Sequence, residues 1–310
     1  VNVATTVVNL VLDYALIFGR WGFPELGIRG AGIATVVAGV FSLLMFLALL
    51  CSRANNSTFH TIKGWRLERD LFVRLLRYGF PSGVQFFLEM AGFTAFVLLV
   101  GRLGIASLAA TNIAFNINTL AFMPMIGCGI AVSVLVGQYL GGDNPDRAQS
   151  AVYSGFHLTL AYMLSIAAAY VLVPDVFVAP FALRADPGGF SEIYGYSIIL
   201  LRFVAVYSVF DTMNIVFCSA IKGAGDTRYV MLITVILSVF VFILPVYLTV
   251  VVFEFGLMVA WVFATAYIIL LGFIFYLRFL GGKWKSMRVI ERPEEVPMLK
   301  PTKLGRVAKL

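Results

Sequence analysis

The sequence predicts an all-α protein built as a polytopic bundle of transmembrane helices. Of its 310 residues 61% are hydrophobic, the mean hydropathy is +0.94, and only 13% are charged. A soluble domain carries about 25% charged residues. The apolar runs are ~20 residues or longer, as helices that cross a bilayer require, whereas membrane β-strands alternate over ~10 residues. We therefore expect a lipid bilayer to surround this chain.

Apolar runs separated by charged breaks predict eight spans. The chain starts with Val1 rather than Met, inside an apolar run and without a signal peptide. We interpret it as a fragment of a longer protein whose upstream helices precede Val1. The predicted spans are approximately 1–18, 26–51, 79–101, 114–140, 149–173, 193–221, 229–253 and 256–280.

Two polar segments accompany the spans. Residues 52–78 form a basic connector, and residues 68–76 within it carry apolar side chains at helical spacing between charges. This pattern predicts a helix that lies along the membrane surface. Residues 282–310 form a basic tail with three prolines, which predicts a disordered extension.

The distribution of positive charge predicts the orientation of the chain. If the spans alternate, then 52–78, the loops near 141–148 and 222–228, and the tail lie on one side. Together with Arg278 at the end of the last span, they hold 18 of the 23 Lys and Arg residues. Such a bias is typical of cytoplasmic segments. We expect a multi-pass protein of the plasma membrane (a bacterial or archaeal inner membrane) with a cytoplasmic C-terminus. The net charge of +7 then requires no nucleic-acid partner.

Two carboxylates, Glu89 and Asp211, each lie about halfway along a predicted span. A charge at the bilayer centre costs ~2.5–3.5 kcal/mol on insertion scales, so it normally faces a cavity, a partner or a moving cation. Gln85 lies on the same helix face as Glu89, four residues earlier, and Pro81 near the start of this span can loosen the helix. The alternative is a purely structural carboxylate, hydrogen-bonded into a helix interface.

Asp211 shares its helix face with Tyr207 and Asn214. A carboxylate, a phenol and an amide oxygen form a set of hard ligands that suits a small cation such as Na⁺. The same carboxylate can instead hold a proton. The residues do not discriminate between Na⁺, H⁺ and a structural polar network.

Gln85, Asn214 and four further side chains are candidates for lining a substrate cavity. Asn112 and Asn116 share a helix face, where their amides can bridge helices or line a cavity. Phe86, near Glu89, and Met123 belong to an aromatic and methionine-rich set that can repack around varied ligands. Core packing is the alternative reading of this apolar set and the favoured one.

One enzyme motif has to be weighed. Gly223-Ala-Gly-Asp226 matches the Gly-x-Gly-Asp signature of intramembrane aspartyl proteases, with Asp211 as the conceivable second aspartate. Two catalytic aspartates must share a proton at close range. Asp226 lies in a basic turn outside the apolar core, at a different depth from Asp211. We therefore expect no catalytic residue, and no cofactor beyond a coupling cation.

Several ordered motifs together resemble the multidrug and toxic compound extrusion (MATE) family. The resemblance covers nearly the whole chain apart from the tail. The segments that carry it are Asp13-Tyr-Ala-Leu-Ile-Phe-Gly19, Gly22-Phe-Pro-Glu-Leu-Gly27, Gly30-Ala-Gly-Ile-Ala-Thr35, Gly79-Phe-Pro81 with Glu89, Ala121-Phe-Met-Pro124 with Gly127, Val136-Gly-Gln-Tyr-Leu-Gly-Gly-Asp-Asn-Pro-Asp-Arg-Ala148 and Lys222-Gly-Ala-Gly-Asp-Thr-Arg228.

The resemblance implies a fold of twelve helices in two lobes, of which this chain holds about helices five to twelve. Residues 1–51 then correspond to the last two helices of the N-lobe and 52–78 to the link between lobes. Residues 79–281 correspond to the six-helix C-lobe and 282–310 to a cytoplasmic tail. The full-length protein is expected to be monomeric.

The resemblance also implies a function. In one branch of the family a Glu in helix seven and an Asp in helix ten bind the coupling cation, and these positions match Glu89 and Asp211, with Tyr207 beside the latter. If the coupling ion is Na⁺, these three residues are its expected ligands. The implied activity is the export of cationic, amphiphilic drugs in exchange for Na⁺ or H⁺.

Two other functions stay open. A lipid-linked oligosaccharide flippase of the same superfamily would bind anionic headgroups through several cationic residues. The charged residues near the middle of the predicted spans are two acids, Glu89 and Asp211, and one base, Arg202. This excess of negative charge favours cationic substrates. A membrane scaffold without transport activity has no use for buried carboxylates on two helices.

Overall fold

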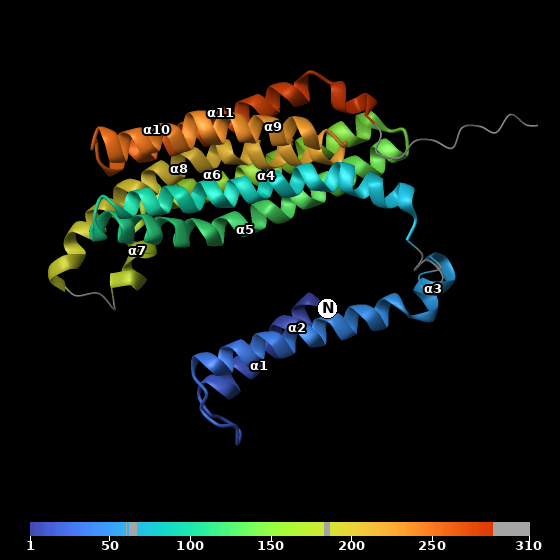
Figure 1. Ribbon diagram of the computed structural model, residues 1–310, viewed down its shortest axis with the longest axis horizontal. Helices are drawn as coiled ribbons and strands as arrows, with labels where there is room; N and C mark the ends of the chain where they lie inside the picture. Colours follow the sequence, from blue (N-terminus) through green and yellow to red (C-terminus); the bar gives the residue numbers. More distant parts are fainter. Residues whose placement is uncertain (60, 62–66, 183–186, 288–310) are drawn as a thin grey trace, which may run out of the picture. The chain divides into compact units, whose positions relative to one another are not determined.

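A computed structural model describes residues 1–59, 61, 67–182 and 187–287, and all regular secondary structure in these residues is helical (Figure 1). The predicted all-α membrane fold is therefore confirmed. The apolar helix α1 (Asn2–Ile17) is too short to be counted among the helices that could cross a membrane. The seven helical segments that are long and apolar enough to cross a membrane are Ile28–Leu50, Arg69–Gly101, Ile105–Gly141, Pro145–Leu172, Phe190–Gly223, Thr227–Val252 and Leu257–Leu280.

The chain divides into two compact units, Val1–Phe72 and Val73–Leu310. In the first unit α1 is followed by α2 (Ile28–Leu50) and the short α3 (Arg53–Phe59). The backbone N–H of Leu26 donates to the Leu16 carbonyl at 2.9 Å, which ties the connecting turn to α1. A Cβ at Gly30 would meet the Leu16 carbonyl oxygen at 2.5 Å, so only glycine permits this close approach of α2 to α1.

The second unit contains the bundle that carries both mid-span carboxylates. Its long helices are α4 (Arg69–Gly101), α5 (Ile105–Gly141), α6 (Pro145–Leu172), α8 (Pro187–Gly223) and α11 (Leu257–Leu280). Helix α8 contacts α5, α6 and α11, so it is the central helix of the bundle (Figure 1). It also contacts the shorter helices α7 and α9.

Helix α4 corrects the prediction for residues 68–76. The structure has no separate surface helix there, because α4 runs without a break from Arg69 through Pro81 to Gly101. A proline inside a helix removes one hydrogen bond but need not end the helix when its neighbours pack around it. Pro81 is buried. Residues 60 and 62–66 of the predicted connector lie outside the described residues.

Three other boundaries differ from the prediction. Helix α5 starts at Ile105 and α8 at Pro187, earlier than the apolar runs suggested, and a short helix α7 (Pro174–Ala182) precedes α8. The additional turns of α5 contain polar residues such as Ser107 and Thr111, both buried. Hydropathy therefore marks the apolar part of a helix and misses turns whose polar side chains are covered by neighbours.

The span Thr227–Val252 is not one uniform α-helix. It consists of α9 (Thr227–Leu237), a π-helical segment η2 (Ser238–Ile243), α10 (Leu244–Tyr247) and a second π-helical segment η3 (Leu248–Val252). Pro245 lies between the two wide segments, where its missing N–H disturbs the regular hydrogen-bond ladder. Wide turns of this kind occur frequently at functional sites.

The chain after α11 is ordered at its start, which differs from a disordered tail beginning at residue 282. A 3₁₀ helix, η4 (Lys283–Ser286), follows α11. The Trp284 indole N–H donates to the Phe279 carbonyl at 2.9 Å, and the two rings stack at 4.8 Å. Burial of Trp284 therefore fixes this segment against the bundle. The rest of the predicted tail, 288–310, lies outside the described residues.

Candidate functional site

Glu89 is held by a hydrogen bond that also leads to a second helix. The Gln85 Nε2 donates to the Glu89 Oε1 at 2.8 Å, along the face of α4 that the four-residue spacing predicted. The same Nε2 lies 3.8 Å from the Cys218 sulfur on α8. Gln85 is only 4% exposed, whereas Glu89 is half-buried. A buried amide thus links the Glu89 carboxylate to the central helix.

Asp211 lies on α8 within a set of polar side chains from two helices. The Asn214 Nδ2 donates to the Asp211 Oδ1 at 2.9 Å. One turn before Asp211, the Tyr207 hydroxyl accepts a hydrogen bond from the Asn118 Nδ2 of α5 at 3.2 Å. Asp211 is 6% exposed and Tyr207 is 5% exposed. The carboxylate is therefore almost fully removed from solvent within the described part of the chain.

The two carboxylates are close enough for their charges to interact. Four residues of α8 follow one another at spacings of three or four, so they form one stripe along the helix: Tyr207, Asp211, Asn214 and Cys218. Gln85 meets this stripe at Cys218. Glu89 and Asp211 therefore belong to one polar region that spans α4, α5 and α8.

Close packing between α8 and α11 supports this region from the other side. A Cβ at Gly272 of α11 would meet the Phe210 carbonyl oxygen at 2.7 Å, directly beside Asp211 in the chain. The backbones can approach this closely only because residue 272 has no side chain. Gly272 thus sets how closely α8 packs against α11 beside Asp211.

The donor set defines which cations the region can hold. Among the described residues, no group of three or more His, Cys, Asp and Glu side chains is placed to hold a metal ion. A cation here would therefore combine carboxylate oxygens with neutral ones, such as the Tyr207 hydroxyl and the Asn214 amide oxygen. Hard oxygen ligands of mixed charge suit Na⁺, and the same carboxylates can carry protons.

Of the six candidate cavity residues, Gln85 and Asn214 belong to this region and the other four do not. Phe86 is 63% exposed and Met123 is 56% exposed. Asn112 and Asn116 are also exposed, and the Asn116 Nδ2 donates to the Asn112 carbonyl at 2.8 Å. They lie on surfaces of α4 and α5 that the described residues leave uncovered. Phe96, by contrast, is 2% exposed and packs against Phe242 and Trp261 in the core.

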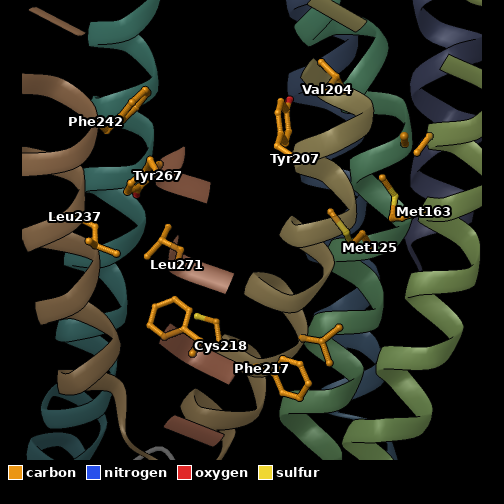
Figure 2. Packing of buried hydrophobic residues seen from close by; sticks show 14 of the residues in the cluster. Met125, Met163, Val204, Tyr207, Phe217, Cys218, Leu237, Phe242, Tyr267 and Leu271 are labelled. Atoms are coloured by element: carbon orange, nitrogen blue, oxygen red, sulfur yellow. The ribbon is translucent and has the colours of Figure 1, made fainter. Parts of the chain in front are cut away.

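Three residues that the sequence did not predict as cation-coupling residues interact with this region. The Asn118 amide bonds Tyr207, and the Lys222 ammonium acts electrostatically on Glu89. The Tyr267 phenol of α11 interacts with both carboxylates and stacks on Phe242 at 4.9 Å (Figure 2). Lys222 follows Asp211 by eleven residues, about three helical turns, so its shared face could have been recognised. Tyr267 carried no such signal.

The protease motif has a structural explanation instead. Asp226 lies in the turn between α8 and α9, and its Oδ2 accepts hydrogen bonds from the Arg278 Nε at 3.0 Å and the Nη2 at 2.6 Å. The Arg278 guanidinium also lies 4.2 Å from the centre of the Tyr229 ring. An aspartate bound by arginine in this way cannot share a proton with Asp211, so no aspartate dyad forms.

Comparison with known sequences identifies relatives along nearly the whole chain. A family model described as MatE matches residues 81–248. The chain is 30% identical over 299 residues to a probable multidrug resistance protein NorM of Thermotoga maritima, covering 93% of this chain and 60% of that protein. It is 32% identical over 232 residues to a multidrug resistance protein NorM of Burkholderia vietnamiensis, covering 75% and 50%. The chain thus spans about half to three-fifths of the length of these relatives.

Solved structures have the same arrangement of helices. One is described as the outward-facing conformation of a multidrug resistance MATE family transporter of the MOP superfamily. It superposes with a TM-score of 0.80 at 19% sequence identity, over 91% of this chain and 62% of that one. At this identity the likeness establishes the fold alone.

Proposed function

Because the chain belongs to the MatE family, we propose that it works in a secondary active antiporter that exports cationic, amphiphilic compounds in exchange for Na⁺ or H⁺. Relatives with the name multidrug resistance protein support the substrate class. The two mid-span carboxylates support the preference for cations, since oxygen donors of negative charge attract positive groups. Glu89, Asp211 and Tyr207 are the proposed coupling residues.

The observation that carries this proposal is the connection between Glu89 and Asp211. They lie on different helices, yet Gln85 links the first to the α8 face that bears the second. A change in the occupancy of Glu89 therefore acts on the contact between α4 and α8. Such coupling between ion binding and helix contacts is what an alternating-access cycle requires.

The proposed cycle rests on competition between cation and drug. Occupancy of the carboxylates by Na⁺ or H⁺ lowers the affinity for the exported compound, and reciprocity requires the converse. Cation entry then favours drug release, and rocking of the lobes resets access. Pro81 in α4, Pro124 in α5 and Pro245 between the π-helical segments weaken the helix ladder where such bending would occur.

The proposal includes a location and an orientation. The protein is placed in the plasma membrane as a monomer, with the basic connector and the C-terminus in the cytoplasm. Positive charge on the loops supports this orientation.

The test is dye efflux from proteoliposomes that contain the full-length protein, with Na⁺ and H⁺ gradients imposed separately. Glu89→Gln and Asp211→Asn each remove a charge with little change of shape, and gradient-driven efflux should fall at least tenfold in both. Glu254→Gln is the matched control, because Glu254 is an exposed acid in the turn before α11. Gradient-driven efflux at the unmodified rate in both carboxylate variants would contradict the proposal. Transfer of lipid-linked oligosaccharide in place of cationic dye would favour a flippase.

A further inference from the structure

A polar cavity is lined by residues near the start of α4 and by the turn between α8 and α9. Its volume is about 210 Å³. Pockets for drug-sized ligands measure about 300–1,000 Å³, so this one suits a smaller group. Figure 1 shows the first turns of α4 and α9 at the same end of the bundle. The lining residues are Arg77, Tyr78, Ala224, Gly225, Asp226, Thr227, Arg228 and Met287.

Two arginines give the cavity a positive potential. Arg77 of α4 and Arg228 of α9 both line it, and neither has an ion-pair partner among the residues that the structure describes. The acid beside them, Asp226, is neutralised by Arg278 at 2.6 Å. Unpaired guanidinium groups from two helices that line one cavity form a typical binding site for phosphate oxygens.

The N-terminus of α9 adds backbone donors to the same cavity. The first amides of a helix have no intrahelical partner, and they are usually capped by a side-chain oxygen. Asp226 occupies the N-cap position, yet its side chain makes no capping hydrogen bond, because Arg278 binds its carboxylate. The N–H groups at the start of α9 are thus left without a side-chain acceptor. An anion at this position would bind them and gain from the helix dipole.

Thr227 supplies an independent indication of a ligand. Thr227 is 5% exposed and lines the cavity, yet its Oγ1 has no hydrogen-bond partner among the described residues. A buried hydroxyl without a partner is costly, so native structures nearly always satisfy it. A phosphate oxygen in the cavity would accept a hydrogen bond from this hydroxyl.

We propose that this cavity binds the phosphoryl group of an anionic membrane lipid. Arg77, Arg228, the Thr227 hydroxyl and the first amides of α9 are the proposed contacts. A lipid is favoured over free phosphate because α4 exposes apolar side chains next to the arginine. Leu76 is 49% exposed and Phe80 is 68% exposed, so acyl chains can lie along α4 while the headgroup enters the cavity.

The test uses the full-length protein in neutral detergent, titrated with phosphatidylglycerol and followed by native mass spectrometry. Arg77→Gln combined with Arg228→Gln should weaken binding at least tenfold, since each change removes a charge-assisted hydrogen bond. Arg147→Gln is the matched control, because Arg147 is an exposed arginine near the start of α6, outside the cavity lining. It should bind phosphatidylglycerol as the unmodified protein does.

Two single substitutions at Thr227 test the proposal even if the double arginine variant fails to fold. Thr227→Val keeps the side-chain shape but removes the hydroxyl, so it should weaken binding several-fold, while Thr227→Ser should retain it. Equal binding by the Thr227→Val, double-arginine and control variants overturns the proposal. Inorganic phosphate that binds the cavity while phosphatidylglycerol does not also overturns the assignment to a lipid.

Discussion

The Gln85 amide lies 2.8 Å from the Glu89 carboxylate and joins it to the central helix of the bundle through Cys218. Gln85 is 4% exposed, so the helices packed around it hold its amide beside Glu89. The relationship makes Gln85 a positioning residue for Glu89. It also gives the first prediction.

Gln85→Met should lower gradient-driven efflux by about threefold to tenfold while the protein still folds. The thioether fills a similar volume, but the hydrogen bond to Glu89, worth about 1 kcal/mol net or more, is lost. The measurement is the initial rate of dye efflux in proteoliposomes. Gln138→Met is the control, since Gln138 is exposed on α5. An unchanged rate in Gln85→Met would show that the Gln85 amide does not position Glu89.

Tyr207→Phe tests whether the phenol oxygen takes part in cation binding. Loss of the hydroxyl removes a possible ligand and leaves the Asn118 amide without its acceptor. If transport is coupled to Na⁺, the Na⁺ concentration for half-maximal efflux should rise about tenfold. Tyr196→Phe, on the same helix, should leave it unchanged. An equal Na⁺ dependence in both variants contradicts the assignment of Tyr207.

Lys222→Met removes the positive charge that acts on Glu89. Without this competing charge the carboxylates should attract the coupling cation more strongly. The cation concentration for half-maximal efflux should therefore fall about threefold or more, and the maximal rate should fall because release is slower. Lys283→Met, an exposed lysine of η4, is the control. A rise in that concentration would contradict the expected effect of Lys222.

Gly272→Ala should destabilise the bundle by about 1–3 kcal/mol, because the new Cβ would lie 2.7 Å from the Phe210 carbonyl oxygen. The expected result is a lower unfolding temperature in detergent and a lower efflux rate, since Asp211 follows Phe210. Gly195→Ala is the control, as nothing lies within 4 Å of the corresponding Cβ. Equal unfolding temperatures for the two variants would show that α8 and α11 separate without cost.

The helices and their order could be predicted because a bilayer imposes a local rule on sequence. A run such as Ile28–Leu50 is long and apolar whatever it packs against, so hydropathy alone identifies it. The start of α4 at Arg69 could not be predicted in this way. Its first turns are charged, and their continuity with the span through Pro81 depends on packing rather than composition.

Site residues on one helix were predictable, and those from other helices were not. The spacing of Tyr207, Asp211 and Asn214 places them on one face of α8 by helix geometry alone. Asn118 of α5 and Tyr267 of α11 reach the same region only because these helices pack against α8. No spacing within the sequence carries that information.

By itself, then, the sequence determined an all-α membrane protein with two carboxylates at mid-span, because the cost of polar groups in lipid acts on each segment independently. Only the tertiary structure decided that Gln85 would link Glu89 to α8, and that Arg278 would bind Asp226 and leave the start of α9 uncapped. Both outcomes depend on contacts between distant segments, and these arise from the packing of whole helices.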